Sequence, residues 1–229
     1  MNESKNVIIS SKYSVEDKVG RILAFLEEVW EKEDAPLKKY VNSKGETPFQ
    51  VLISTILSLR TKDDITYPTS KKLFEILKTP EDFVKIDTKK LEKLIYPVGF
   101  FRNKAKTIKE VSRIILDKYN GIVPSELEEL LKLPGVGRKT ANLVLSVAFG
   151  KDAICVDTHV HRISNRIGLV KTKNPTETEF ELMKILPKEH WGKINHLMVA
   201  FGQTICKPVK PRCKECKLKD VCNYYFGKV

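Results

Sequence analysis

The sequence predicts an all-α protein. Apolar residues recur at helical spacing nearly throughout, as in Ile22, Leu23 and Leu26, and this period is typical of amphipathic helices. Sustained alternation of apolar and polar residues, the pattern of strands, does not occur. Turn-forming residues separate the apolar runs and predict many short helices with tight connections. These turn signals stand at 47–48, 66–70, 78–82 and 120–126.

Composition indicates a folded, basic chain. With 229 residues, 41% of them hydrophobic, it can bury a substantial core. Its 41 Lys and Arg residues outnumber 29 Asp and Glu residues, which gives a formal net charge of +12. Such an excess favours a polyanionic partner, most often nucleic acid, although it also fits a merely solvated surface.

The sequence contains no recognisable membrane-spanning or secretion signal. No apolar run reaches the ~18 residues that would span a bilayer, and the first residues do not form a signal peptide. We therefore expect a protein without membrane contact, cytoplasmic and nucleoid-associated, or nuclear in a eukaryote. Four of five cysteines fall between positions 206 and 222, and in a reducing compartment this clustering favours metal ligation over disulfides.

Two segments, 91–108 and 127–144, resemble each other: each has a short helix containing Leu-Glu, a glycine turn, and basic residues opening a second helix. We interpret both as helix-hairpin-helix units. In the second, Gly135 and Gly137 can adopt positive φ and allow close approach of another backbone. The spacing does not fit a phosphate loop of nucleotide-binding proteins, because Arg138 and not glycine precedes the lysine.

The second hairpin predicts an anion site. A helix starting near Arg138 leaves unpaired backbone N–H groups at its positive dipole end, where a DNA phosphate can bind without readout of base sequence. The residues expected to contact DNA here are Gly135, Val136, Gly137 and Arg138. A plain tight connection between two helices is the alternative.

Three motifs in this order carry a resemblance to a known family: LPGVGRKTAN at 133–142, VDTHVHR at 156–162, and four cysteines separated by six, two and five residues. The chain resembles, from about residue 20 to 225, the endonuclease III family of DNA glycosylases, within the helix-hairpin-helix superfamily. The resemblance implies removal of oxidised or ring-saturated pyrimidines from duplex DNA and strand cleavage at the resulting abasic site.

The resemblance also implies the architecture. A six-helix barrel lobe with the helix-hairpin-helix is expected over 41–151, and a cluster lobe over 1–40 and 152–229. The DNA cleft is expected between the two lobes, with Lys139 and Asp157 facing each other across it.

Lys139 matches the family's nucleophile, which attacks the sugar C1′ and forms a Schiff base. Its expected place is the first turn of a helix, next to Arg138 and at the positive end of the helix dipole. By position alone it could be a solvated lysine. Related enzymes that only excise the base typically lack lysine here, so Lys139 favours a combined glycosylase and lyase.

Asp157 is expected to be the N-cap of the helix that follows it. Backbone N–H donors would keep its carboxylate ionised, and a carboxylate near C1′ can stabilise positive charge on the sugar and accept protons from the lysine. A cap without a catalytic role is the alternative reading.

The cysteines Cys206, Cys213, Cys216 and Cys222 match the spacing of the family's [4Fe–4S] cluster. Zinc is the rival, but zinc ribbons usually present two Cys-x2-Cys pairs and only one occurs here. The loop 207–212 would present three cations to DNA phosphates, and Cys155 is expected in the core. The three cations are Lys207, Lys210 and Arg212.

Excision requires that the nucleotide leave the helix and that its space be filled. The residues matching the family's wedge and plug are Phe100 and Arg60, although Phe100 could be half-buried core. Many relatives have glutamine where Arg60 stands, and arginine would favour guanine as the opposite base.

The expected partner is double-stranded DNA with damaged pyrimidines or abasic sites, bound by a monomer. Three rival functions remain open from the sequence: a non-catalytic helix-hairpin-helix DNA-binding protein, a uracil or thymine mismatch glycosylase without lyase activity, and a zinc protein of unrelated function.

Overall fold

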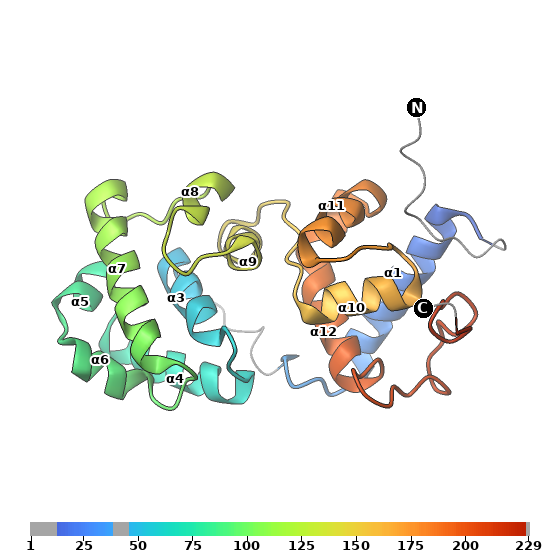
Figure 1. Cartoon of the computed structure of the whole chain (residues 1–229), viewed down its shortest axis with the longest axis horizontal. Helices are drawn as coiled ribbons and strands as arrows, with labels where there is room; N and C mark the ends of the chain where they lie inside the picture. The colour runs from blue at the N-terminus through green and yellow to red at the C-terminus, as the bar shows by residue number, and fades with distance from the viewer. Residues whose placement is uncertain (1–12, 39–45, 228–229) are drawn as a thin grey trace. The chain divides into compact units, whose positions relative to one another are not determined.

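The protein, described by a computed structural model over residues 13–38 and 46–227, divides into two compact units (Figure 1). One consists of Met1–Lys39 with Ile154–Val229, and the other of Tyr40–Ala153. The second begins one residue before and ends two residues after the predicted 41–151. All regular elements in the described ranges are helices, so the all-α prediction is confirmed.

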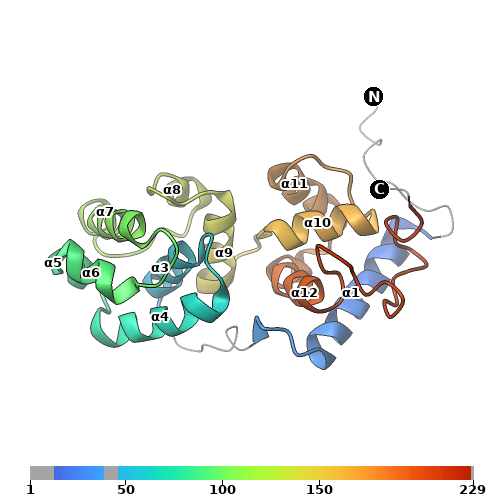
Figure 2. The same cartoon turned by 60° about the horizontal axis from the view of Figure 1, so that its bottom comes forward.

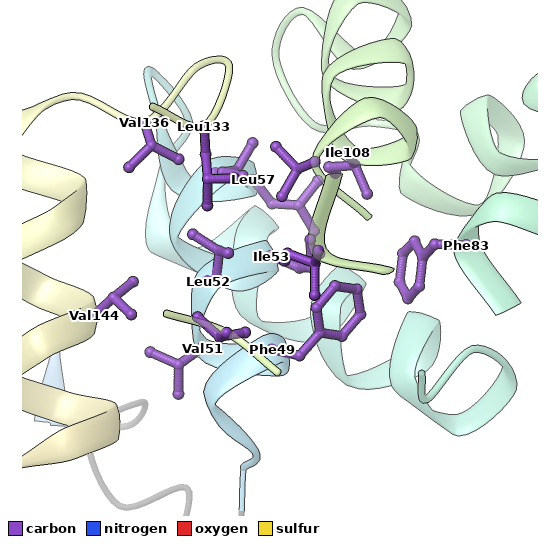
Figure 3. Close-up of a cluster of buried hydrophobic side chains, with 14 of the residues drawn as sticks. Phe49, Val51, Leu52, Ile53, Leu57, Phe83, Ile108, Leu133, Val136 and Val144 are labelled. Carbon is purple, nitrogen blue, oxygen red and sulfur yellow. The ribbon is translucent and has the colours of Figure 1, made fainter. Parts of the chain in front are cut away.

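The unit Tyr40–Ala153 holds seven helices within its described residues, compared with the six that were predicted. They are α3 (Pro48–Ser58), α4 (Asp63–Ile76), α5 (Pro80–Lys85), α6 (Thr88–Ile95), α7 (Phe101–Tyr119), α8 (Leu127–Leu131) and α9 (Arg138–Phe149). Helix α3 contacts α4, α7 and α9, and its side chains, including Leu52 and Ile53, occupy the middle of the core (Figure 3).

Capping explains where these helices begin. Thr47 and Thr79 are N-caps with reciprocal capping boxes, each followed by proline in the first turn. The turn predicted at 66–70 is wrong, because those residues lie inside α4 with Pro68 in its interior. Proline removes one helical hydrogen bond, but the buried Leu73 and Phe74 beyond it keep the helix packed on the core.

The other unit contains four α-helices and a short 3-10 helix among its described residues. They are α1 (Val15–Lys32), α10 (Thr158–Ile167), α11 (Pro175–Ile185), η1 (Lys188–His190) and α12 (Trp191–Thr204). Helices α1 and α10 both pack on α12 (Figure 2), where the rings of Phe25 and Phe201 meet edge to face at 5.6 Å. Cys155 is buried, as predicted. No helix in the described segments is sufficiently long and apolar to span a membrane.

Candidate active site and DNA-binding surface

The second hairpin, defined here as α8, residues 132–137 and α9, exposes an uncapped helix start. Gly137 is the N-cap of α9 and offers no side-chain acceptor to the first amides. Gly135 has φ of +74°, as predicted, but Gly137 has φ of −93°. The expectation of a second positive φ was wrong, because an N-cap residue adopts extended backbone. A helix start without a side-chain cap, at the positive end of the helix dipole, is a typical place for an anion to bind.

Val136 contributes to this hairpin differently from its neighbours. Its side chain is 6% exposed and packs beside Leu133 in the core (Figure 3). Its side chain is therefore directed away from solvent, and contact between Val136 and DNA would have to involve backbone atoms. The apolar anchor fixes the turn that carries Gly135 and Gly137.

Lys139 is the second residue of α9, directly after Arg138. Both side chains are half-buried. The helix starts where the sequence predicts it, so Lys139 lies in its first turn, two residues after Gly137.

Asp157 is the N-cap of α10, as predicted, and its Oδ1 accepts a hydrogen bond from the Val160 N–H at 2.9 Å. The side chain is half-buried, and its second oxygen is not used by this cap. Lys139 and Asp157 belong to different units, so their expected pairing across a cleft stays a prediction.

The first hairpin, defined as α6, residues 96–100 and α7, presents Phe100, whose side chain is 60% exposed. The alternative of a core phenylalanine does not fit this exposure. Arg60, in the segment 59–62 that we call the Arg60 loop, is also exposed. Its guanidinium carbon lies 5.9 Å from the centre of the Phe100 ring, so the two predicted DNA-inserting side chains are neighbours.

The four clustered cysteines line one hollow, with apolar walls that include Phe201 and Leu218. All four are free thiols. They are Cys206, Cys213, Cys216 and Cys222. Within the described segments, no three Cys, His or carboxylate side chains converge closely enough to hold a single metal ion. Four thiols that line one hollow match the type and number of ligands that zinc and iron–sulfur sites use.

Burial and one arginine set the electrostatics of this hollow. Burial raises the pKa of the Cys206 and Cys222 thiols, and that of Cys216 to about 11. Arg166 opposes this at Cys206, because its Nη1 donates toward the sulfur at 3.9 Å. The same guanidinium donates to the carbonyls of Lys207 and Pro208, each at 2.8 Å, and thus fixes the start of the basic loop.

The three cations of the loop 207–212 differ in their environment. Lys207 and Lys210 are exposed, and no carboxylate in the described ranges forms an ion pair with either. Arg212 instead pairs with Glu215 and with Glu33, the latter at 3.5 Å. Its charge is partly compensated, so the two lysines are better placed to contact phosphate.

Comparison with known proteins supports the interpretation of the three sequence motifs. Residues 53–188 match the HhH-GPD superfamily of base excision DNA repair proteins. Endonuclease III of Thermotoga maritima is 58% identical over 184 residues, covering 80% of this chain and 86% of that protein. The chain belongs to the endonuclease III family. Members of this family are base excision repair DNA glycosylases with AP lyase activity.

Other members and solved structures agree with this assignment. Endonuclease III of Bacillus subtilis is 44% identical, covering 77% of this chain and 81% of that protein. A trapped covalent intermediate of endonuclease III with DNA has a TM-score of 0.78 at 40% identity, covering 91% of this chain and 97% of that one. A thermostable thymine-DNA glycosylase has a TM-score of 0.81 at 28% identity, covering 92% and 97%.

Sequence reasoning missed residues that support the site. Lys104 and Thr61 bind the segments that carry Phe100 and Arg60, and Arg166 holds the cysteine loop. A signal for Lys104 was present, since it stands among Phe101, Ala105 and Ile108 on the apolar face of a helical pattern. A lysine at such a position must place its charge on internal acceptors.

Proposed function

We propose that this member of the endonuclease III family removes oxidised or ring-saturated pyrimidines from duplex DNA and cleaves the strand 3′ to the abasic site. The amine of Lys139 attacks C1′, the N-glycosidic bond breaks, and its electrons leave with the base. Sugar ring opening gives an imine between Lys139 and C1′. Loss of a C2′ proton then expels the 3′ phosphate by β-elimination. The observation that carries this proposal is a lysine in the first turn of α9, whose N-cap Gly137 forms no side-chain cap.

Asp157 has the electrostatic and proton-accepting role in this proposal. Its cap bond orients the carboxylate, and an ionised carboxylate near C1′ stabilises the positive charge that develops as the base departs. Gly135, Gly137 and Arg138 bind the phosphate backbone, with Lys207 and Lys210 as further contacts. Phe100 and Arg60 fill the space that the extruded nucleotide leaves. A monomer is sufficient for this arrangement.

The cysteine hollow is proposed to hold a [4Fe–4S] cluster ligated by Cys206, Cys213, Cys216 and Cys222. Bound there, the cluster would supply a rigid crosslink of the C-terminal segment, not the chemistry of base removal. We expect the purified protein to be brown and to contain iron and acid-labile sulfide in equal amounts. Zinc without iron would contradict the assignment.

Borohydride trapping tests the catalytic proposal. Wild-type protein is expected to form a covalent complex with duplex DNA that contains an oxidised pyrimidine, because borohydride reduces the imine. Lys139→Gln is expected to abolish trapping while DNA binding persists. Lys132→Gln is the matched control, since Lys132 lies in the same hairpin but pairs with Glu129, and it is expected to trap normally.

The thymine-DNA glycosylase likeness makes an excision-only enzyme the second candidate. If the protein were such an enzyme, the wild type would release the damaged base and form no trapped covalent complex. Trapping by Lys139→Gln would show that another amine is the nucleophile, and DNA binding without base release would indicate a non-catalytic binding protein.

A further inference from the structure

Two loops of the same unit carry the exposed side chains Arg60 and Phe100, and both residues have left-handed backbone. The φ angles are +53° at Arg60 and +58° at Phe100. Neither residue is glycine, so each conformation is unfavourable by itself. Such residues persist where the surrounding structure fixes them, and they concentrate at ligand clamps and active sites. Something in the fold must therefore hold both loops.

The side chain of Lys104 makes this connection. It lies in the first turn of α7 and is 7% exposed. Its ammonium donates to the carbonyls of Leu57 at 2.7 Å and Leu59 at 2.6 Å, and to the Thr61 hydroxyl at 3.0 Å. The three N–H donors of one ammonium are thus matched by three acceptors. The acceptors lie at the end of α3 and in the Arg60 loop, where helix carbonyls lack internal partners and the dipole favours a cation.

Thr61 joins the two loops at one atom. Its Oγ1 accepts hydrogen bonds from the ammonium of Lys104 and from the Gly99 N–H at 3.1 Å. Gly99 also fits closely against the Arg60 loop, because a Cβ there would lie 3.0 Å from the Arg60 carbonyl oxygen. Gly99, which precedes Phe100, is therefore bound to Thr61, which follows Arg60.

We propose that Lys104 is a positioning residue for DNA opening, which holds the Arg60 loop and the first hairpin in one arrangement so that Arg60 and Phe100 enter the duplex together. This inference rests on the proposed function, in which both side chains fill the space of an extruded nucleotide. Lys104 itself is buried beneath the loops and acts through them. Loss of its ammonium leaves the two left-handed residues without their shared support.

Lys104→Met tests the proposal, since it removes the ammonium and retains an unbranched apolar stem. Lys109→Met is the matched control. Lys109 lies on the same helix and its ammonium likewise donates to three carbonyls, those of Phe83, Val84 and Ile86. These carbonyls belong to the C-terminal end of α5 and to neither of the two loops.

Three readouts separate positioning from general stability. The first is the single-turnover rate of base excision from a duplex containing thymine glycol. The second is the fluorescence of 2-aminopurine placed beside an abasic analogue in a duplex, which reports local opening without catalysis. The third is β-elimination at an abasic site in a single strand, which needs no opening.

Lys104→Met is expected to slow duplex excision between about tenfold and a hundredfold relative to Lys109→Met, to lose the fluorescence rise, and to retain single-strand cleavage. Equal values for the two variants in the first two readouts would overturn the proposal. Thr61→Val, which removes only the shared hydroxyl, is expected to show a smaller loss of the same kind. If circular dichroism shows that Lys104→Met is unfolded, the comparison of Thr61→Val with Lys109→Met tests the proposal instead. A wild-type protein that opens the abasic duplex but neither excises nor traps would refute the proposed function and leave this inference standing.

Discussion

The two hairpins of the unit Tyr40–Ala153 have similar sequences but differ in backbone conformation and in which side chain they expose. Aligned in register, Gly99 corresponds to Gly135 and Phe100 to Val136. In the second hairpin the glycine has the left-handed backbone, and Val136 is buried. In the first hairpin the left-handed residue is Phe100, one position later, and its ring is 60% exposed.

This shift by one residue has a physical consequence. Glycine adopts positive φ without a steric penalty, so the second hairpin needs no support beyond its apolar anchor. A left-handed phenylalanine is unfavourable, and the first hairpin acquires Lys104 and Thr61 as additional support. One hairpin thus exposes backbone amides, suited to a phosphate, and the other exposes a ring, suited to insertion between bases.

The largest effect is expected from Gly135→Ala. A Cβ there would lie 2.8 Å from Thr107 Cγ2, and φ is +74°, so we expect the free energy of unfolding to fall by about 2–4 kcal/mol. Gly137→Ala is the control, because its backbone is extended and nothing lies within 4 Å of the added atom. Urea denaturation of both variants measures the difference. Equal losses would mean that left-handed backbone is not what distinguishes the two glycines.

The next prediction compares the residues that follow the aligned glycines. Val136→Ala is expected to lower the free energy of unfolding by about 1.5–2.5 kcal/mol, because it leaves a cavity in the core. Phe100→Ala is expected to change stability by less than about 0.5 kcal/mol and to reduce duplex excision about tenfold or more, since the vacated space is no longer filled. The comparison fails if Val136→Ala impairs excision without loss of stability.

The smallest effect is expected from pH. Burial lowers the pKa of Lys104 to about 8, below the ~10.4 of a free lysine. As pH rises through 8 the ammonium is lost, and a neutral amine has only two N–H donors for three acceptors. Wild-type opening of the abasic duplex is therefore expected to weaken a few-fold between about pH 7 and pH 9, and 2-aminopurine fluorescence measures it.

The contribution of Lys104 to protein stability changes with pH in the opposite direction to duplex opening. Between the folded and unfolded pKa values the unfolded chain binds more protons at Lys104, so this group's contribution to the free energy of unfolding rises with pH. Loss of opening with a rising contribution to stability would therefore identify deprotonation of Lys104. A Lys104→Met variant with the same pH profile as wild type would assign the effect to another group.

Local signals in the sequence predicted much of the site. Glycine and proline placed the second hairpin, and the start of α9 at Arg138 followed from them. Asp157 was identified as an N-cap because a short acceptor side chain precedes a helical pattern. The turn predicted around Pro68 was wrong, because local propensity favours a helix break there and the long-range packing of α4 overrides that propensity.

The amino-acid sequence by itself determined the all-α class, the family motifs, and the residue types of the proposed nucleophile, carboxylate and cysteine ligands, because each depends on neighbours a few positions away. The tertiary structure alone decided that Phe100 is exposed and its counterpart Val136 buried, and that Lys104 binds acceptors more than 40 positions distant. Hydrogen bonds between residues so far apart depend on how the helices pack, and no local pattern records them.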